Sequence, residues 1–184
     1  MLRSGDAAPP INTTDIFGKP VQLERMSRRF VLLAFLRYAG CPWCNLAIHR
    51  LALEHPMLKR EGCDVIAFVQ SGKQQIQTNI YDRHKVVPEF PVVPDSARVF
   101  YERYGVQSSK AAVLSSVLKV PFWLQAAFKH GFHQTEVDGD LFLVPALFLV
   151  DTKTNQIVYS RYSSSFYEHT TFTEIYEHLT FEKV

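Results

Sequence analysis

The chain has 184 residues, 47% of them hydrophobic and 13% aromatic, which is enough to bury one sizeable core and too little for two ordinary domains. Its 20 Lys and Arg residues nearly balance 18 Asp and Glu residues, and the absence of a basic block argues against nucleic acid as a partner. Three cysteines are too few for a disulfide-stapled secreted scaffold, but Cys41 and Cys44 form a Cys-x-x-Cys pair.

The N-terminal segment and the apolar runs bear on where the protein acts. The start, MLRSGDAAPPINTTD, contains no apolar stretch like that of a signal peptide. The long run AAVLSSVLKVPFWLQAAF is interrupted by Lys119 and Pro121, so it is a poor membrane span. We therefore expect a single cytoplasmic domain, residues 1–184, without a membrane as partner.

The first part of the chain predicts an entry hairpin, a buried strand and a long helix. Residues 6–23 contain two short strand-like segments around the turn Gly18-Lys19-Pro20, and they should cover one edge of a sheet. Phe30–Leu36 is a continuous apolar run typical of a strand buried on both faces. A helix should run from about Pro42 to Arg60 and stop at Gly62.

Strands and helices continue to alternate through the middle of the chain. Asp64–Gln70 is a second apolar strand, and the polar segment 72–84 indicates a surface helix. Phe90–Val93 predicts a short third strand, followed by a helix from Pro94 to Gly105.

The last third of the chain begins with an extra segment. We expect residues 107–140 to be an insertion that forms a helix. This helix should be broken near Pro121 and followed by a flexible stretch. Two strands, Phe142–Val150 and Ile157–Arg161, should then form a hairpin, and Thr171–Leu179 a final helix. The order βαβ, then a β-hairpin and a helix, is that of an α/β, thioredoxin-like fold, with a central mixed sheet flanked by helices.

The Cys41-Pro42-Trp43-Cys44 segment follows the buried strand and begins the long helix. Pro42 suits the first helical position, which makes Cys41 the cap residue and places Cys44 on the same side. Lowering the pKa of a free thiol from about 8.5 to 7 takes roughly 2 kcal/mol. A partly buried helix N-terminus supplies up to about 2 kcal/mol, so no catalytic base is required.

Each cysteine has a predicted role in a redox-active pair. Cys41 should be the more exposed sulfur and attack a disulfide, and Cys44 should resolve the mixed disulfide. Arg37, four residues before Cys41, would add to the stabilisation of the thiolate. Trp43 either shapes access to the site or simply shields the end of the helix.

A zinc site is the main alternative for a Cys-x-x-Cys pair, and it needs two further ligands. The third cysteine, Cys63, lies beyond the far end of the helix, about 27 Å away at 1.5 Å per residue. His49 and His55 do not fall near the pair on that helix either. We therefore expect no metal, and we expect Cys63 to be a packed core thiol.

A second feature of the predicted site is Val144-Pro145, far from the cysteines in sequence. A proline at the start of an internal strand cannot donate to the ladder, which suggests a special bend and a cis Val144-Pro145 bond. An ordinary trans proline at a strand start is the alternative. In the thioredoxin fold this loop faces the Cys-x-x-Cys pair.

Three segments resemble the peroxiredoxin-like (AhpC/TSA) branch of the thioredoxin superfamily. They are GDAAPPINTTDIFGKPVQL, FPVVPDSARVFYERYGV and PALFLVDTKTNQIVYSR. The resemblance implies a thiol-dependent enzyme without a bound cofactor. It also implies peroxide or protein disulfide as substrate, a thioredoxin- or glutaredoxin-like reductant, and a homodimer as a common assembly.

The site departs from the family's Pro-xxx-Thr-xx-Cys motif. By that motif Cys44 corresponds to the peroxidatic cysteine, Cys41 replaces the threonine, and Arg37 or a neighbour replaces the proline. Pro145 corresponds to the family's conserved arginine. CPWC resembles instead the CPYC of glutaredoxins, and Val144-Pro145 the cis-proline loop of thioredoxins.

Two classes of function follow from these patterns. The first is a thiol-disulfide oxidoreductase or thiol-dependent peroxidase that forms a reversible Cys41–Cys44 disulfide. The second is a non-enzymatic redox sensor, in which the pair controls how the apolar 107–140 segment meets a partner. That segment otherwise covers the site or packs on the sheet, and we expect its His130 and His133 to lie on the surface.

Overall fold

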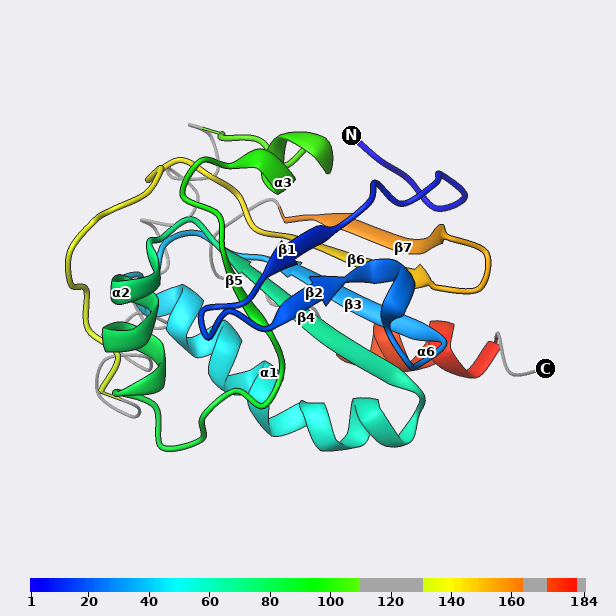
Figure 1. Cartoon of the computed structure of the whole chain (residues 1–184), viewed down its shortest axis with the longest axis horizontal. Coiled ribbons are helices and arrows are strands. Elements are labelled where there is room, and N and C mark those ends of the chain that lie inside the picture. The colour runs from blue at the N-terminus through cyan, green and yellow to red at the C-terminus, as the bar shows by residue number, and fades with distance from the viewer. Residues whose placement is uncertain (110–130, 164–171, 182–184) are drawn as a thin grey trace.

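The computed structural model describes residues 1–109, 131–163 and 172–181. Its centre is a five-stranded sheet with the order β5-β4-β3-β6-β7. The strands are β3 (Phe30–Phe35), β4 (Cys63–Val69), β5 (Val92–Pro94), β6 (Ala146–Asp151) and β7 (Gln156–Tyr162). Strand β4 pairs in parallel with β3 and β5, whereas β6 pairs antiparallel with β3 and β7. This mixed sheet with helices on both faces (Figure 1) confirms the predicted thioredoxin-like α/β fold.

Strand β3 lies at the centre of the sheet because its sequence, FVLLAF, is apolar on both faces, and all six residues are buried. One face, which includes Leu32 and Ala34, packs in the same core as residues of α1 (Pro42–Arg60) and α6 (Phe172–Phe181). The other face, with Leu33 and Phe35, packs with residues of α3 (Val99–Arg103) and of the N-terminal segment. Figure 1 shows α1 and α6 together below the sheet and α3 above it.

The N-terminal hairpin was predicted correctly. Strands β1 (Asn12–Thr14) and β2 (Pro20–Gln22) pair antiparallel, and a single 3-10 turn, η1 (Leu23–Arg25), follows. The hairpin meets the sheet at its β5 edge, where the Ile16 N–H donates to the Val92 carbonyl at 3.1 Å.

Helix α1 has the predicted bounds, since it begins at Pro42 and ends at Arg60. Gly62 stops it in the left-handed region, at a φ of +78°. The polar segment after β4 forms a short helix, α2 (Lys73–Ile76), which continues as a π-helical turn, η2 (Gln77–Tyr81).

Two predicted boundaries were wrong by four residues or more. Helix α3 begins at Val99 rather than near Pro94, because the Asp95 carboxylate accepts the N–H groups of Val99 at 2.9 Å and Phe100 at 2.8 Å. Strand β6 begins at Ala146 rather than Phe142, because Pro145 has no N–H to give to the ladder.

The helix expected in the 107–140 insertion falls mainly on residues 110–130, outside the described residues. The described remainder has no regular secondary structure. Residues 131–142, called the strap below, pass from the α2 side of the molecule toward β6 (Figure 1). The strap crosses the loop that carries Cys41.

Candidate active site

Cys41 stands at the junction of the β3–α1 loop and helix α1. It is the N-cap residue, with extended backbone angles, and Pro42 occupies the first helical position as expected. The Cys41 carbonyl accepts the Asn45 N–H at 3.0 Å, which is the first hydrogen bond of the helix. The Cys41 sulfur therefore lies where unpaired N–H groups and the helix dipole favour a negative charge.

Arg37, from the same loop, lies against this sulfur. Its Nη1 is 3.5 Å from Cys41 Sγ, and its Nη2 donates to the Leu141 carbonyl of the strap at 2.7 Å. The guanidinium also lies over the Tyr38 ring, 5.1 Å from its centroid. Because Arg37 is only 5% exposed, its charge acts on the thiol with little screening by water.

The two thiols have opposite shifts in pKa. Burial raises the pKa of Cys41, but a hydrogen bond from Cys44, the charge of Arg37 and N–H groups of the first helical turn outweigh it, so the pKa falls to about 6. Burial raises the pKa of Cys44 well above 9.0, and its hydrogen bond to Cys41 and the nearby Cys41 charge raise it further. At neutral pH this arrangement gives a Cys41 thiolate beside a Cys44 thiol.

The prediction that Cys41 is the more exposed cysteine was wrong. Cys41 is 1% exposed and Cys44 3%, and both are reduced. Cys44 lines an apolar pocket on the α6 side of α1, whereas Cys41 is not among its lining residues. Cys41 is buried because the strap lies over the loop before it. The periodicity of the sequence does not predict this tertiary contact.

Two of the other predicted site residues lie at the same pocket. Trp43 and Pro145 line it together with Cys44, which brings the two distant motifs into one place. Val144 is buried and its N–H donates to the Gln107 carbonyl at 3.2 Å. The described residues contain no cis peptide bond. The prediction of a cis Val144-Pro145 bond was therefore wrong, and the bond is trans, as in the alternative. The missing N–H of Pro145 is accommodated by starting β6 one residue later, at Ala146.

Asn45 is a site residue that sequence reasoning missed. Its side-chain amide donates to the Ala39 carbonyl at 2.7 Å and to the Cys41 carbonyl at 2.9 Å, and its Oδ1 lies 2.7 Å from His84 Nε2. It is completely buried. The available signal was an amide one residue after CPWC, in a helix whose neighbouring positions are apolar.

The strap holds the loop through several contacts. The Thr135 N–H donates to the Gly40 carbonyl at 3.1 Å, and the Tyr38 hydroxyl donates to Gln134 Oε1 at 3.2 Å. Ser71 links the two segments, because its hydroxyl accepts the Ala39 N–H at 2.7 Å and donates to the Asp138 carboxylate at 2.8 Å. The described part of the insertion thus covers the candidate site, one of the expected alternatives.

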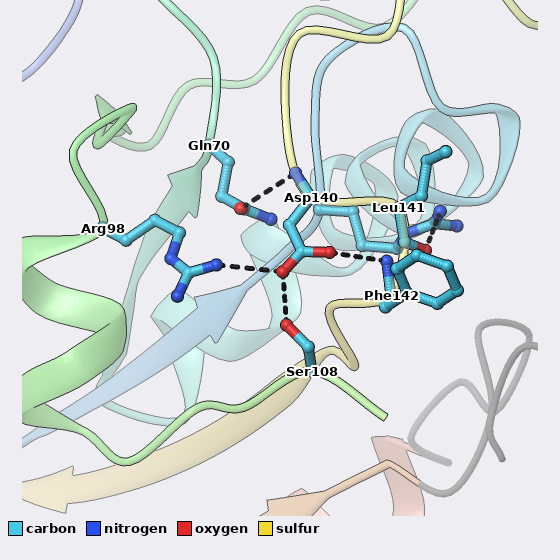
Figure 2. Close-up of polar contacts among 7 residues, drawn as sticks. Gln70, Arg98, Ser108, Asp140, Leu141 and Phe142 are labelled. Atoms are coloured by element: carbon cyan, nitrogen blue, oxygen red, sulfur yellow. Dashed lines mark hydrogen bonds and ion pairs between the residues drawn. The ribbon is translucent and has the colours of Figure 1, made fainter. Parts of the chain in front are cut away.

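Asp140 fastens the strap next to Leu141, as Figure 2 shows. Its carboxylate pairs with Arg98 at 2.9 Å, accepts the Phe142 N–H at 2.8 Å and accepts the Ser108 hydroxyl. Its own N–H donates to Gln70 Oε1 at 3.3 Å. These contacts fix the backbone from which the Leu141 carbonyl reaches Arg37.

Cys63 and the histidines lie away from this centre. Cys63 begins β4 as a fully buried thiol, and burial raises its pKa to about 12, which confirms its predicted packing role. His133 is exposed as expected, and His130 lies outside the described residues. Within the described ranges, no three or more His, Cys, Asp or Glu side chains are grouped so that they could hold a metal ion.

The fold and the paired thiols define a thioredoxin-fold protein of the thiol redox class. The model of the AhpC/TSA family matches residues 4–160, so the chain belongs to that family. It is an oxidoreductase of the thiol peroxidase or thiol-disulfide exchange type. No curated protein matches the sequence.

Solved structures share the fold at low sequence identity. Peroxidoxin BcpB from Mycobacterium tuberculosis is 13% identical, with a TM-score of 0.67 over 98% of this chain and 96% of its own. A candidate thiol:disulfide interchange protein DsbE from Chlorobium tepidum is 17% identical, with a TM-score of 0.64 over 99% and 98%. Yeast mitochondrial 1-Cys peroxiredoxin is 16% identical, with a TM-score of 0.67 over 95% and 73%.

In the described part of this chain, no helix has both the length and the apolar character to cross a membrane.

Proposed function

We propose that the protein is a dithiol oxidoreductase in which Cys41 is the nucleophile and Cys44 the resolving thiol. The observation that carries this assignment is the Arg37 guanidinium, 3.5 Å from the Cys41 sulfur at the N-cap of α1. A buried cation and a helix N-terminus both stabilise a thiolate, and the thiolate is the reactive form. Cys44, with its raised pKa, holds the proton until it is needed.

The proposed reaction with a disulfide has two displacement steps. The Cys41 thiolate attacks one sulfur of the substrate, forms a mixed disulfide and releases the other sulfur as a thiolate. Cys44 loses its proton and attacks the Cys41 sulfur, which closes the Cys41–Cys44 disulfide and releases the second substrate thiol. An external dithiol reductant then returns both cysteines to the reduced state, so that no bound cofactor is needed.

We extend the proposal to the reductant and the compartment. The yeast 1-Cys peroxiredoxin is described with glutathione and thioredoxin systems. A thioredoxin- or glutaredoxin-like protein in the cytoplasm is the corresponding reductant here, because a reducing compartment keeps such pairs as dithiols. A homodimer stays part of the proposal.

A second candidate, a peroxidase with Cys44 as the peroxide-reacting residue, has two observations in its favour. Cys44 corresponds to the peroxidatic position of the family motif, and Cys44 is the cysteine that lines the pocket. Against it stands the raised pKa of Cys44, since a protonated thiol reacts slowly with peroxide.

Turnover measurements separate the candidates. Consumption of reduced thioredoxin should be followed with a small disulfide and, separately, with hydrogen peroxide, for the wild type and for Cys41→Ser, Cys44→Ser and the control Cys63→Ser. We expect disulfide turnover that Cys41→Ser abolishes and Cys63→Ser leaves intact. Peroxide turnover that survives in Cys41→Ser but not in Cys44→Ser would favour the second candidate. No turnover with either substrate would favour a redox sensor that uses the 107–140 segment.

A further inference from the structure

An apolar pocket lies beside α1, and neither Arg37 nor any residue of the strap is among the described residues that line it. It is bounded by α1, by strands β3 and β6 and by α6, and Figure 1 shows α1 and α6 on this same face of the sheet. Apolar pockets that also present a few polar groups are the usual binding sites of small organic ligands.

The walls of the pocket are chemically uneven. Most of the lining is aliphatic or aromatic, and it includes Leu32 of β3 and Phe172 and Ile175 of α6. Cys44 and Trp43 lie in the lining at the first turn of α1, and Arg50 lies in it two turns later. Arg50 is six positions after Cys44, a distance of about 9 Å along the helix axis.

Arg50 is the single cation among the described residues that line the pocket. No other described residue forms a hydrogen bond or an ion pair with it. Glu54, one turn further along α1, accepts a hydrogen bond from the Tyr176 hydroxyl at 2.9 Å instead. A guanidinium at the side of an apolar pocket presents donors that match a carboxylate.

We infer that this pocket binds a medium-chain alkyl carboxylate, with its carboxylate on Arg50 and its chain along the apolar walls toward Cys44. The apolar walls account for the chain, since burying each CH₂ contributes about 0.8 kcal/mol. Arg50 accounts for the charged group, which the aliphatic walls alone would exclude. The bound chain covers Cys44 and leaves Cys41 unaffected, because only Cys44 lines the pocket.

Binding is testable on the reduced protein without any turnover assay, so failure of this inference and failure of the proposed function are distinguishable. The chain has two tryptophans, and Trp123→Phe leaves Trp43, in the pocket lining, as the single tryptophan. In that background, decanoate should change the Trp43 fluorescence saturably. The uncharged analogue 1-decanol should bind about tenfold more weakly or worse, because it lacks the charged partner for Arg50.

Two variants locate the carboxylate. Arg50→Gln should weaken decanoate binding about tenfold while leaving 1-decanol unchanged. Arg60→Gln, at the exposed end of the same helix, should change neither. Circular dichroism and thermal unfolding check that both variants fold.

A chemical readout locates the chain. In the Cys41→Ser variant, saturating decanoate should slow the alkylation of Cys44 several-fold; in the Cys44→Ser variant, it should leave the alkylation of Cys41 unchanged. The inference is overturned if decanoate does not bind, if Arg50→Gln binds it as tightly as the wild type, or if Cys44 gains no protection.

Discussion

The side chains of His84 and Asn45 form a buried hydrogen bond of 2.7 Å that reaches the Cys41 backbone. The amide nitrogen of Asn45 donates to the carbonyls of Ala39 and Cys41. Its Oδ1 is an acceptor, so His84 must carry a proton on Nε2 to form the hydrogen bond. The pair thereby holds the loop in front of helix α1. His84 in turn stacks on Phe132 of the strap, with ring centroids 4.5 Å apart.

Asn45→Ala should therefore destabilise the protein. It removes three side-chain hydrogen bonds and takes a buried partner away from the Ala39 carbonyl and the His84 N–H, a loss of about 1–3 kcal/mol. Urea denaturation measures the change in the free energy of unfolding. The exposed Asn12→Ala serves as control and should stay within about 0.5 kcal/mol of the wild type. Equal stability of the two variants would contradict the role given to Asn45.

Arg37→Gln should raise the pKa of Cys41 above its value of about 6. The guanidinium favours the thiolate, and an opposite charge at this range changes a pKa by roughly one pH unit or more. The pH dependence of thiolate ultraviolet absorbance in Cys44→Ser, with and without Arg37→Gln, reports the change. Because Cys44 also lowers this pKa, both measurements should start from a value above that of the wild type. Arg37→Lys keeps the charge and should give a smaller increase.

Gly40→Ala should loosen the strap. A Cβ at Gly40 would collide with the Glu136 carbonyl and the Thr135 hydroxyl, and the backbone carbonyl has no freedom to turn aside. We expect faster alkylation of Cys41 and faster proteolysis of residues 131–142. Gly72→Ala is the matched control, since a Cβ there meets no atom within 4 Å. Unchanged Cys41 alkylation in Gly40→Ala would show that the strap does not limit access.

Cys63 should stay unmodified in the native protein. Its burial and its pKa of about 12 leave almost no thiolate at neutral pH. Mass spectrometry after treatment with iodoacetamide should find Cys63 alkylated only once denaturant is added. Native modification of Cys63 at the rate of Cys41 would count against the structure of this core.

Because of the contacts of Asp140, the free energy of unfolding should decrease as the pH is lowered into the acidic range. Burial raises the pKa of Asp140, but the Ser108 hydroxyl, the Phe142 N–H and Arg98 lower it by more, so the folded value lies below 3.8. A carboxyl with a depressed folded pKa stabilises the folded state above its unfolded pKa, and this contribution is lost as the pH falls through the folded value. The unfolding free energy of the wild type should therefore exceed that of Asp140→Asn at pH 7, and the difference should shrink below about pH 4. A difference independent of pH would exclude the ion pair as its cause.

The sequence by itself determined the framework of this protein. The apolar run of β3, the cap at Cys41 with Pro42 behind it and the stop at Gly62 are local features, set by side-chain periodicity and backbone constraints, and they place the two thiols at the start of a helix. Only the tertiary structure decided what surrounds those thiols. The Leu141 carbonyl reaches Arg37 across 104 residues, and His84 reaches Asn45 across 39. Such contacts depend on how the whole chain packs. For that reason the pattern of residues along the chain did not predict the burial of Cys41, the trans bond at Pro145 or the pocket beside Cys44.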